Sequence, residues 1–169
     1  MVRPALSSSP RVLYLLVLAA ALMSLGVSVP DAGAAEPKRV VVVVHEAVPV
    51  RDLGLVELRE LVLGQRRFWG GGARVELIVE ANGGLGRRGF VETVSKMTDL
   101  QFQQYWVGQI FSQRATRAPR AAPDRRLALA LVSAIPGALT IVEDGPLPPR
   151  TRIVTVDGLA PGDARYPLK

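Results

Sequence analysis

Alternating apolar and polar stretches along the chain predict a succession of strands and helices. Five consecutive valines, Val40–Val44, form an unbroken β-branched run. Such a run suits a central strand that helices cover on both faces, as in a parallel sheet. The next pattern is helical, since leucines recur at Leu55, Leu58 and Leu61 with charged residues between them. Gly64 is expected to end this helix.

The middle of the chain predicts a second strand and two helices. Arg74–Val79 alternates polar and apolar residues as a strand does, and a short helix is expected over Gly89–Ser95. The next helix has a clear start, because Thr98 and the glutamine three residues later form a capping box. A buried stripe is expected on this helix from three large side chains at four-residue steps: Phe102, Trp106 and Ile110.

The last third of the chain predicts a loop, a helix and two strands before a polar tail. Ser112–Pro123 reads as a loop, with three arginines spaced between alanines and prolines. The elements after it are Asp124–Ala134, a helix, and Ala138–Val142 and Arg152–Val156, both strands. The helix is expected to turn Leu127, Leu131 and Ala134 inward. Strands and helices alternate without internal repeats, which predicts an α/β layered sheet with helices on both faces.

The first 35 residues predict an export signal. Two arginines precede an uncharged apolar run of 14 residues, Val12–Leu25, and small residues lead up to Ala34 and Ala35. The run is shorter than the roughly 20 residues that a membrane-spanning helix needs, so a cleaved signal peptide is favoured over a permanent anchor. Cleavage near Ala34 or Ala35 leaves residues 36–169, or 134 of the 169 residues, as a single periplasmic domain.

Composition excludes several kinds of site. The chain has no cysteine, which excludes a disulfide, a lipidated cysteine anchor, a thiolate nucleophile and a zinc-thiolate site. Loss of two arginines and one aspartate with the signal leaves 19 of 21 basic and 14 of 15 acidic side chains. Nearly all the basic ones are arginine, which grips phosphate and carboxylate oxygens well. In an exported protein this excess favours anions or anionic lipid over nucleic acid, and a solvated basic surface is the plainer interpretation.

Three separated stretches carry a family resemblance. They are Leu58–Trp69 (LRELVLGQRRFW), Tyr105–Phe111 (YWVGQIF) and Pro136–Val142 (PGALTIV). In this order they resemble the second lobe of phosphate-type (type 2) periplasmic solute-binding proteins, over about Val40–Val156. The resemblance implies one lobe of that fold, a non-enzymatic function in binding phosphate or a related oxyanion, and an ABC permease as partner. It also implies that Trp69 and Trp106 are packing residues.

The candidate anion site is the glycine-rich segment after the strand Arg74–Val79. In open α/β sheets a ligand sits beyond the carboxyl ends of the strands, where the first turn of the next helix offers unpaired amides. The serine-glycine-threonine set that the resembled family carries here is absent, but backbone amides and two arginines remain. The candidate ligand-binding residues are Asn82, Gly83, Gly84, Gly86, Arg87 and Arg88, with His45 expected near the same crevice at the end of its own strand.

Other interpretations of these residues stay open. The segment is equally consistent with a flexible glycine-rich turn that carries two solvent-facing arginines. Gly84–Gly89 also reads GxGxxG, but the helix that follows it, in place of a second parallel strand, argues against a dinucleotide site. His45 beside Glu46 is more often a hydrogen-bonding group at a strand end than a catalytic base. No catalytic residue, metal site or cofactor is therefore predicted.

Two functional hypotheses remain. The first is a periplasmic solute-binding-like protein for phosphate or a related oxyanion. One lobe leaves a ligand half exposed, so this hypothesis includes completion by a homodimer or by a partner. The alternative is an exported interaction module that kept the lobe fold and lost the small ligand. That module recognises an envelope protein or an anionic surface through the arginines of Arg114–Arg126, and nucleic acid is not an expected partner.

Overall fold

The computed structural model describes residues 38–81 and 83–168, so the predicted signal peptide and Asn82 lie outside the described residues. Contacts divide the chain into Met1–Glu36 and Pro37–Lys169, and all that follows concerns the second unit. None of the helices formed by the described residues combines the length and apolar character that crossing a membrane requires.

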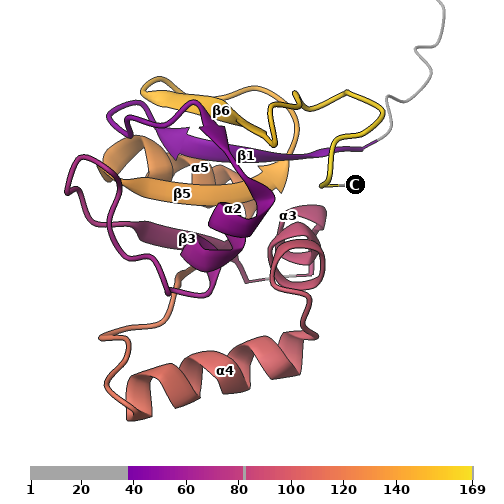
Figure 1. The fold of residues 1–169 in the computed structure, drawn as a ribbon. Coiled ribbons are helices and arrows are strands. Elements are labelled where there is room, and N and C mark those ends of the chain that lie inside the picture. The colour runs from indigo at the N-terminus through magenta and orange to yellow at the C-terminus, as the bar shows by residue number, and fades with distance from the viewer. Residues whose placement is uncertain (1–37, 82, 169) are drawn as a thin grey trace, which may run out of the picture. The chain divides into compact units, whose positions relative to one another are not determined.

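A mixed six-stranded sheet lies at the centre of this unit (Figure 1). Its strands, in sheet order, are β2 (Asp52–Leu53), β6 (Thr151–Val156), β1 (Val40–His45), β5 (Ala138–Glu143), β3 (Glu76–Glu80) and β4 (Arg120–Ala122). β1 is antiparallel to both of its neighbours, whereas β4 and β5 each run parallel to β3. The carboxyl ends of β3, β4 and β5 therefore meet at one edge of the sheet, and that of β1 lies at the opposite edge.

The valine run forms β1, whose six residues are all buried. The prediction of a central strand covered on both faces is confirmed, but its parallel setting is wrong. Val40, Val42 and Val44 pack into one core, while Val41 and Val43 pack into a second core on the other face. Burial on both faces requires cover by helices, and it does not specify the direction of the neighbouring strands.

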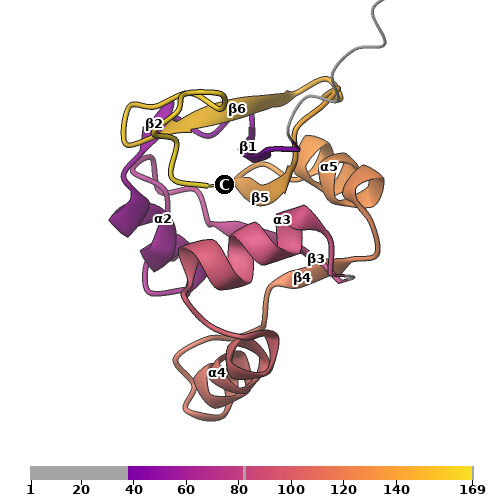
Figure 2. The ribbon, with the colours of Figure 1, turned by 90° about the vertical axis from the view of Figure 1, so that its right-hand side faces the viewer.

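Helices cover both faces of the sheet, which confirms the predicted layered α/β fold (Figures 1 and 2). The first core includes residues of α2 (Leu55–Val62), the π-helix η2 (Gly89–Val94) and α4 (Asp99–Phe111), and the second includes residues of α5 (Arg125–Ala134). A one-turn helix, α3 (Leu85–Arg88), runs directly into η2. The predicted capping box is present, since Thr98 Oγ1 accepts from the amide of Gln101 at 3.2 Å and Gln101 Oε1 from the amide of Thr98 at 2.9 Å.

The buried stripe of α4 is shorter than predicted. Phe102 and Trp106 are buried, but Ile110 is 40% exposed. α4 lies beside the sheet edge in both ribbon views, and only its first two turns reach the core (Figures 1 and 2). The four-residue spacing places Ile110 on the same side of α4 as Phe102 and Trp106, but Ile110 does not belong to the core cluster.

The buried face of α5 also differs from the prediction. The buried residues are Ala128, Leu129 and Val132. Of the three predicted, Leu131 is partly buried and packs against the second core, whereas Leu127 and Ala134 are exposed. Both sides of this helix are rich in apolar residues, so its periodicity alone does not select the side that packs.

Two segments predicted to be irregular or polar take part in the fold. Within the predicted loop Ser112–Pro123, three residues form the edge strand β4. The sequence does not predict β4, because the strand has only three residues and a proline lies on each side of it. The tail is not simply polar, since Tyr166 and Leu168 are buried against the first core.

Candidate functional site

A crevice of about 490 Å³ lies where the carboxyl ends of β3, β4 and β5 meet. Three segments line it. The first is Glu80 at the end of β3 with Gly83, Gly84 and Leu85 after it, the second is Pro123, Asp124 and Arg125 after β4, and the third is Glu143 at the end of β5. This is the edge of the sheet at which a ligand is expected in an open α/β fold. The structure thus has a crevice beside the glycine-rich segment.

The glycines of this segment differ in their surroundings. Gly83 and Gly84 line the crevice, and Gly84 caps α3 without a side-chain hydrogen bond. Gly86 is buried, and a Cβ there would lie 2.5 Å from the carbonyl oxygen of Ile141 and 2.7 Å from a carboxylate oxygen of Glu80. Only a glycine allows α3 to approach β5 this closely.

The two candidate arginines do not line the crevice. Arg87 donates from Nε to the carboxylate of Asp99 at 2.7 Å and from Nη1 to the carbonyl oxygen of Glu80 at 3.0 Å. These bonds tie α3 to the end of β3 and the start of α4. Arg88 borders a separate hollow together with Glu92. Arg87 and Arg88, the two arginines predicted to supply positive charge to a ligand, therefore do not line the crevice.

His45 lies at the opposite edge of the sheet, so the expectation that it sits near the crevice is wrong. The reason is the direction of β1, which is antiparallel to β5 and pairs His45 with Thr151. The ring is buried, and its Nδ1 accepts a hydrogen bond from the amide of Ala47 at 3.0 Å. This contact fits the alternative of a hydrogen-bonding group at a strand end.

Three carboxylates and one guanidinium line the crevice, and each is engaged by the protein itself. Asp124 caps α5 by accepting from the amide of Leu127 at 2.8 Å. Glu143 lies 3.5 Å from the ammonium of Lys38, and Arg125 donates to the backbone oxygen of Glu143 at 2.8 Å. Among the described residues, no group of three or more histidine, aspartate or glutamate side chains is placed to hold a metal ion.

The third carboxylate, Glu80, is only 7% exposed. Burial raises the pKa of its carboxyl above the ordinary value, while the charge of Arg125 and a hydrogen bond from the backbone of Arg87 oppose the rise. The nearby carboxylates of Glu143 and Asp124 add to it. Glu80, which lines the crevice, therefore keeps its proton to a higher pH than an exposed glutamate does.

Replacing Glu80 by glutamine is expected to stabilise the protein at pH 7 more than at pH 4. The raised pKa means that the folded state holds the proton more tightly than the unfolded state. The contribution to stability is therefore complete below the ordinary value of 4.5 and is lost as the pH rises through the folded pKa. Urea unfolding of both proteins at the two pH values measures the effect, and an equal difference at both would contradict it.

Much of the crevice was not recognised from the sequence. The residues missed are Pro123, Asp124, Arg125 and Glu143, which reach the glycine-rich segment only because β4 and β5 pair in parallel with β3. Their one signal was position, since each lies at or just after the end of a strand. For Pro123, Asp124 and Arg125 this signal depends on β4, which lies within the segment predicted to be a loop.

The arginines of residues 114–126 do not form one surface. Arg117 makes an ion pair with Glu76 at the start of β3, whereas Arg125 lines the crevice at the opposite end of that strand. The segment is divided between two edges of the sheet. This arrangement does not favour an interaction module built on that segment as a whole.

Comparison with known proteins finds solved structures of similar fold. No protein-family model and no curated protein matches the chain. A protein assigned as a phosphate ABC transporter substrate-binding protein from Clostridium perfringens, solved with bound phosphate, is 18% identical, with a TM-score of 0.57 over 73% of this chain and 46% of that chain. An ABC-type phosphate transport receptor from Vibrio cholerae is 14% identical, with a TM-score of 0.53 over 72% and 48%.

A third solved structure, PstS from Borrelia burgdorferi, is 9% identical, with a TM-score of 0.59 over 78% of this chain and 54% of that chain. At these identities the likeness concerns the fold alone. The chain spans about half the length of the solved proteins it matches. Over that half, the chain has the fold of phosphate ABC transporter substrate-binding proteins.

Proposed function

We propose that this protein is an exported, non-enzymatic solute-binding protein of the periplasm that takes phosphate or a related oxyanion in the crevice. The observation that carries the proposal is the crevice of about 490 Å³ beside Gly83 and Gly84, at the carboxyl ends of parallel strands in this fold. Crevices in this position are the usual ligand sites of open α/β sheets. By analogy with the solved proteins of this fold, an ABC permease is the expected partner.

Backbone amides are the groups proposed to hold the ligand. Gly84 precedes the first turn of α3, where amides lack partners within the helix, and Gly84 itself has no side chain to cap them. The backbone of Arg87 is hydrogen-bonded to Glu80, so the amides at the very start of the turn are the ones proposed. Gly83 has no atom within 4 Å of the position that a Cβ would take, so the loop leaves room beside its backbone. The carboxylates of Asp124 and Glu143 are already bonded within the protein, which reduces their repulsion of an anion.

Completion by a second copy or by an envelope protein is part of the proposal. The chain spans about half of the receptors whose fold it shares. A ligand on a single lobe stays open to water and salt, which weakens electrostatic attraction. We expect the isolated chain to bind phosphate weakly, and to bind it more tightly when a second lobe covers the crevice.

Replacing Gly83 by aspartate is expected to weaken phosphate binding by at least about tenfold, because it adds a negative charge beside the anion. The space around Gly83 accommodates the new side chain, so folding should be kept. Calorimetric titration with phosphate and sulfate measures the affinity. Gly83→Asn is the matched control, since it has nearly the same shape and no charge. The absence of phosphate heat from the folded wild-type protein would refute the proposal.

A further inference from the structure

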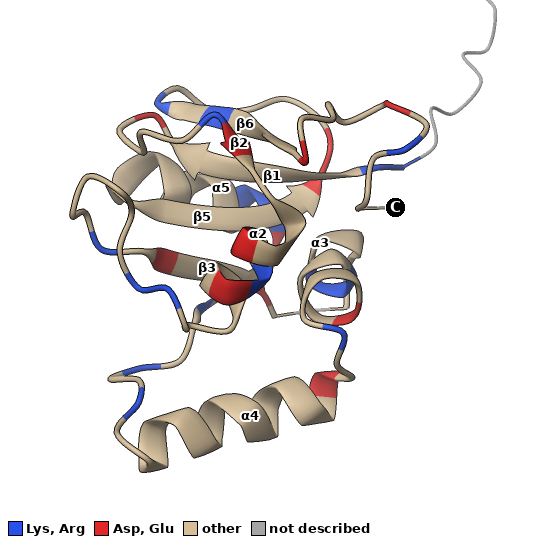
Figure 3. Ribbon diagram, in the orientation of Figure 1, with Lys and Arg blue, Asp and Glu red and all other residues tan. Residues whose placement is uncertain are grey.

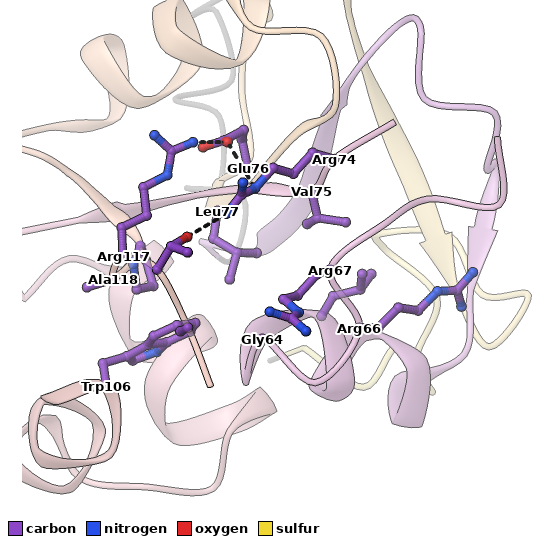
Figure 4. Close-up of a pocket in the computed structure, with 14 residues that line it drawn as sticks. Gly64, Arg66, Arg67, Arg74, Val75, Glu76, Leu77, Trp106, Arg117 and Ala118 are labelled. Atoms are coloured by element: carbon purple, nitrogen blue, oxygen red, sulfur yellow. Dashed lines mark hydrogen bonds and ion pairs between the residues drawn. The ribbon is translucent and has the colours of Figure 1, made fainter. Parts of the chain in front are cut away.

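A second cavity lies at the other end of β3, away from the crevice (Figure 4). We call it the arginine pocket and define it by Arg67, Arg74, Glu76, Trp106 and Arg117, which line it together with Arg66 and a set of mostly apolar residues. Its volume is about 50 Å³. That space exceeds the 10–15 Å³ that one water molecule needs and suits a small polyatomic ion or a single headgroup.

The two sites are separate. The arginine pocket is lined by Glu76, the first residue of β3, whereas the crevice is lined by Glu80, the last residue of that strand. Four residue steps along a strand span about 13 Å. A ligand in one cavity therefore does not touch the residues that line the other.

The charge of the arginine pocket is strongly positive. Arg67, Arg74 and Arg117 face a single carboxylate in the lining, that of Glu76. A fourth lining arginine, Arg66, is paired with a carboxylate outside the lining, that of Glu57. Figure 3 shows the basic residues on the two loops that meet here, the one before β3 and the one after α4. Two positive charges thus remain without a counterion from the lining.

Hydrogen bonds hold the three guanidinium groups in place. Arg74 and Arg117 converge on Glu76, as Figure 4 shows, and Arg74 also donates to Thr116 Oγ1 at 2.7 Å. Arg67 donates to the backbone oxygen of Arg114 at 3.3 Å. These contacts favour one arrangement of the three side chains, which lowers the entropic cost of binding. Arg74 and Arg117 nevertheless remain half exposed, with 50% and 55% of their side chains open to solvent.

Trp106, one of the lining residues, carries a buried polar group without a partner. Trp106 is only 6% exposed, and within the described residues its indole N–H makes no hydrogen bond. By contrast, the indole N–H of Trp69 is bonded to the backbone oxygen of Gly137 at 2.9 Å. A buried donor without an acceptor is costly and uncommon in folded proteins. No internal hydrogen bond fixes this N–H, so its resonance is expected to respond when the lining around Trp106 rearranges.

We propose that the arginine pocket is a second anion site that takes a phosphate-type group, either free phosphate or a phosphate monoester carried on a larger molecule. Planar guanidinium groups match the oxygens of phosphate, and several of them around one cavity favour a group with more than one negative charge. The proposal is independent of ligand binding in the crevice, since the two cavities have no lining residue in common.

The two tryptophans of the chain give a direct readout. In ¹⁵N-labelled protein titrated with inorganic phosphate, we expect the indole resonance of Trp106 to shift in a saturable way and that of Trp69 to shift less. Arg67→Ala and Arg117→Ala should each weaken this binding by about tenfold or more, the size expected for loss of a charged hydrogen bond. Arg126→Ala removes the same charge from the exposed surface of α5 and should leave the binding unchanged.

A second arm identifies the source of the phosphate group. Vesicles of phosphatidylcholine with and without phosphatidic acid are mixed with the protein and sedimented. Retention by phosphatidic acid that is lost in the Arg67→Ala, Arg117→Ala double variant would indicate a headgroup, whereas a Trp106 shift with phosphate alone would indicate a soluble ligand. Gly83→Asp should preserve both signals, which separates this site from the crevice. No Trp106 shift and no vesicle retention, or the same signals in the double variant, would overturn the proposal.

Discussion

Replacing Phe90 by alanine is expected to lower the free energy of unfolding by about 3–5 kcal/mol. Phe90 is fully buried in η2 and packs edge-on against Phe102, with 6.1 Å between ring centroids and 81° between ring planes. Truncation leaves a cavity between η2, α4 and the sheet, and the surrounding side chains fill it only partly. Urea unfolding, followed by circular dichroism, measures the loss.

Two variants show whether the cavity is the cause. Phe90→Leu keeps most of the volume and should cost clearly less than Phe90→Ala. Phe111→Ala removes the same ring from a site that is 85% exposed at the end of α4, and its effect should stay within about 0.5 kcal/mol. A loss at Phe111 as large as that at Phe90 would contradict this account of the core.

Replacing Gly137 by alanine is expected to cost about 3 kcal/mol, for two separate reasons. Gly137 has a φ of +86°, a conformation that costs a residue with a Cβ about 1–2 kcal/mol. The added Cβ would also lie 2.2 Å from the carbonyl oxygen of Arg74, which is backbone and cannot move aside cheaply. Such crowding in a packed site costs typically about 1–3 kcal/mol.

Gly72 separates the two contributions. It has a similar φ of +81°, but no atom lies within 4 Å of the position that a Cβ would take. Gly72→Ala should therefore show the conformational cost alone, about 1–2 kcal/mol in chemical unfolding. If the two substitutions lowered the free energy of unfolding equally, the close approach of Gly137 to Arg74 would not contribute to the loss at Gly137. Gly137 also accepts the hydrogen bond of Trp69, so the indole resonance of Trp69 should move in Gly137→Ala.

The two proposed sites lie at opposite ends of the same strand. The crevice collects residues at the carboxyl ends of β3, β4 and β5, while the arginine pocket lies where β3 begins. Under the two proposals, the protein holds a solute at one edge of the sheet and an anionic group at the other. The crevice variant Gly83→Asp and the pocket variant Arg117→Ala test the two functions separately.

The candidate site shows where sequence reasoning succeeded and where it did not. The sequence predicts the glycine-rich segment between a strand and a helix, and in the structure Gly83 and Gly84 line a crevice. Arg87 and Arg88 follow directly in the sequence but their side chains lead to Asp99 and to a separate hollow. Adjacency along the chain specifies where a backbone goes, whereas the direction of a long side chain depends on the partners that packing brings to it.

The sequence by itself determined the features that depend on neighbours within one or two turns of chain. These include the buried valine strand, the leucine face of α2 and the capping box of Thr98, because burial pattern and capping depend on local spacing. Only the tertiary structure decided which strands run parallel. Because β1 is antiparallel to β5 and β6, His45 lies at the edge of the sheet opposite the crevice. Strand direction, the buried side of α5 and the gathering of arginines around Glu76 all depend on contacts between residues far apart in the chain, which no local pattern encodes.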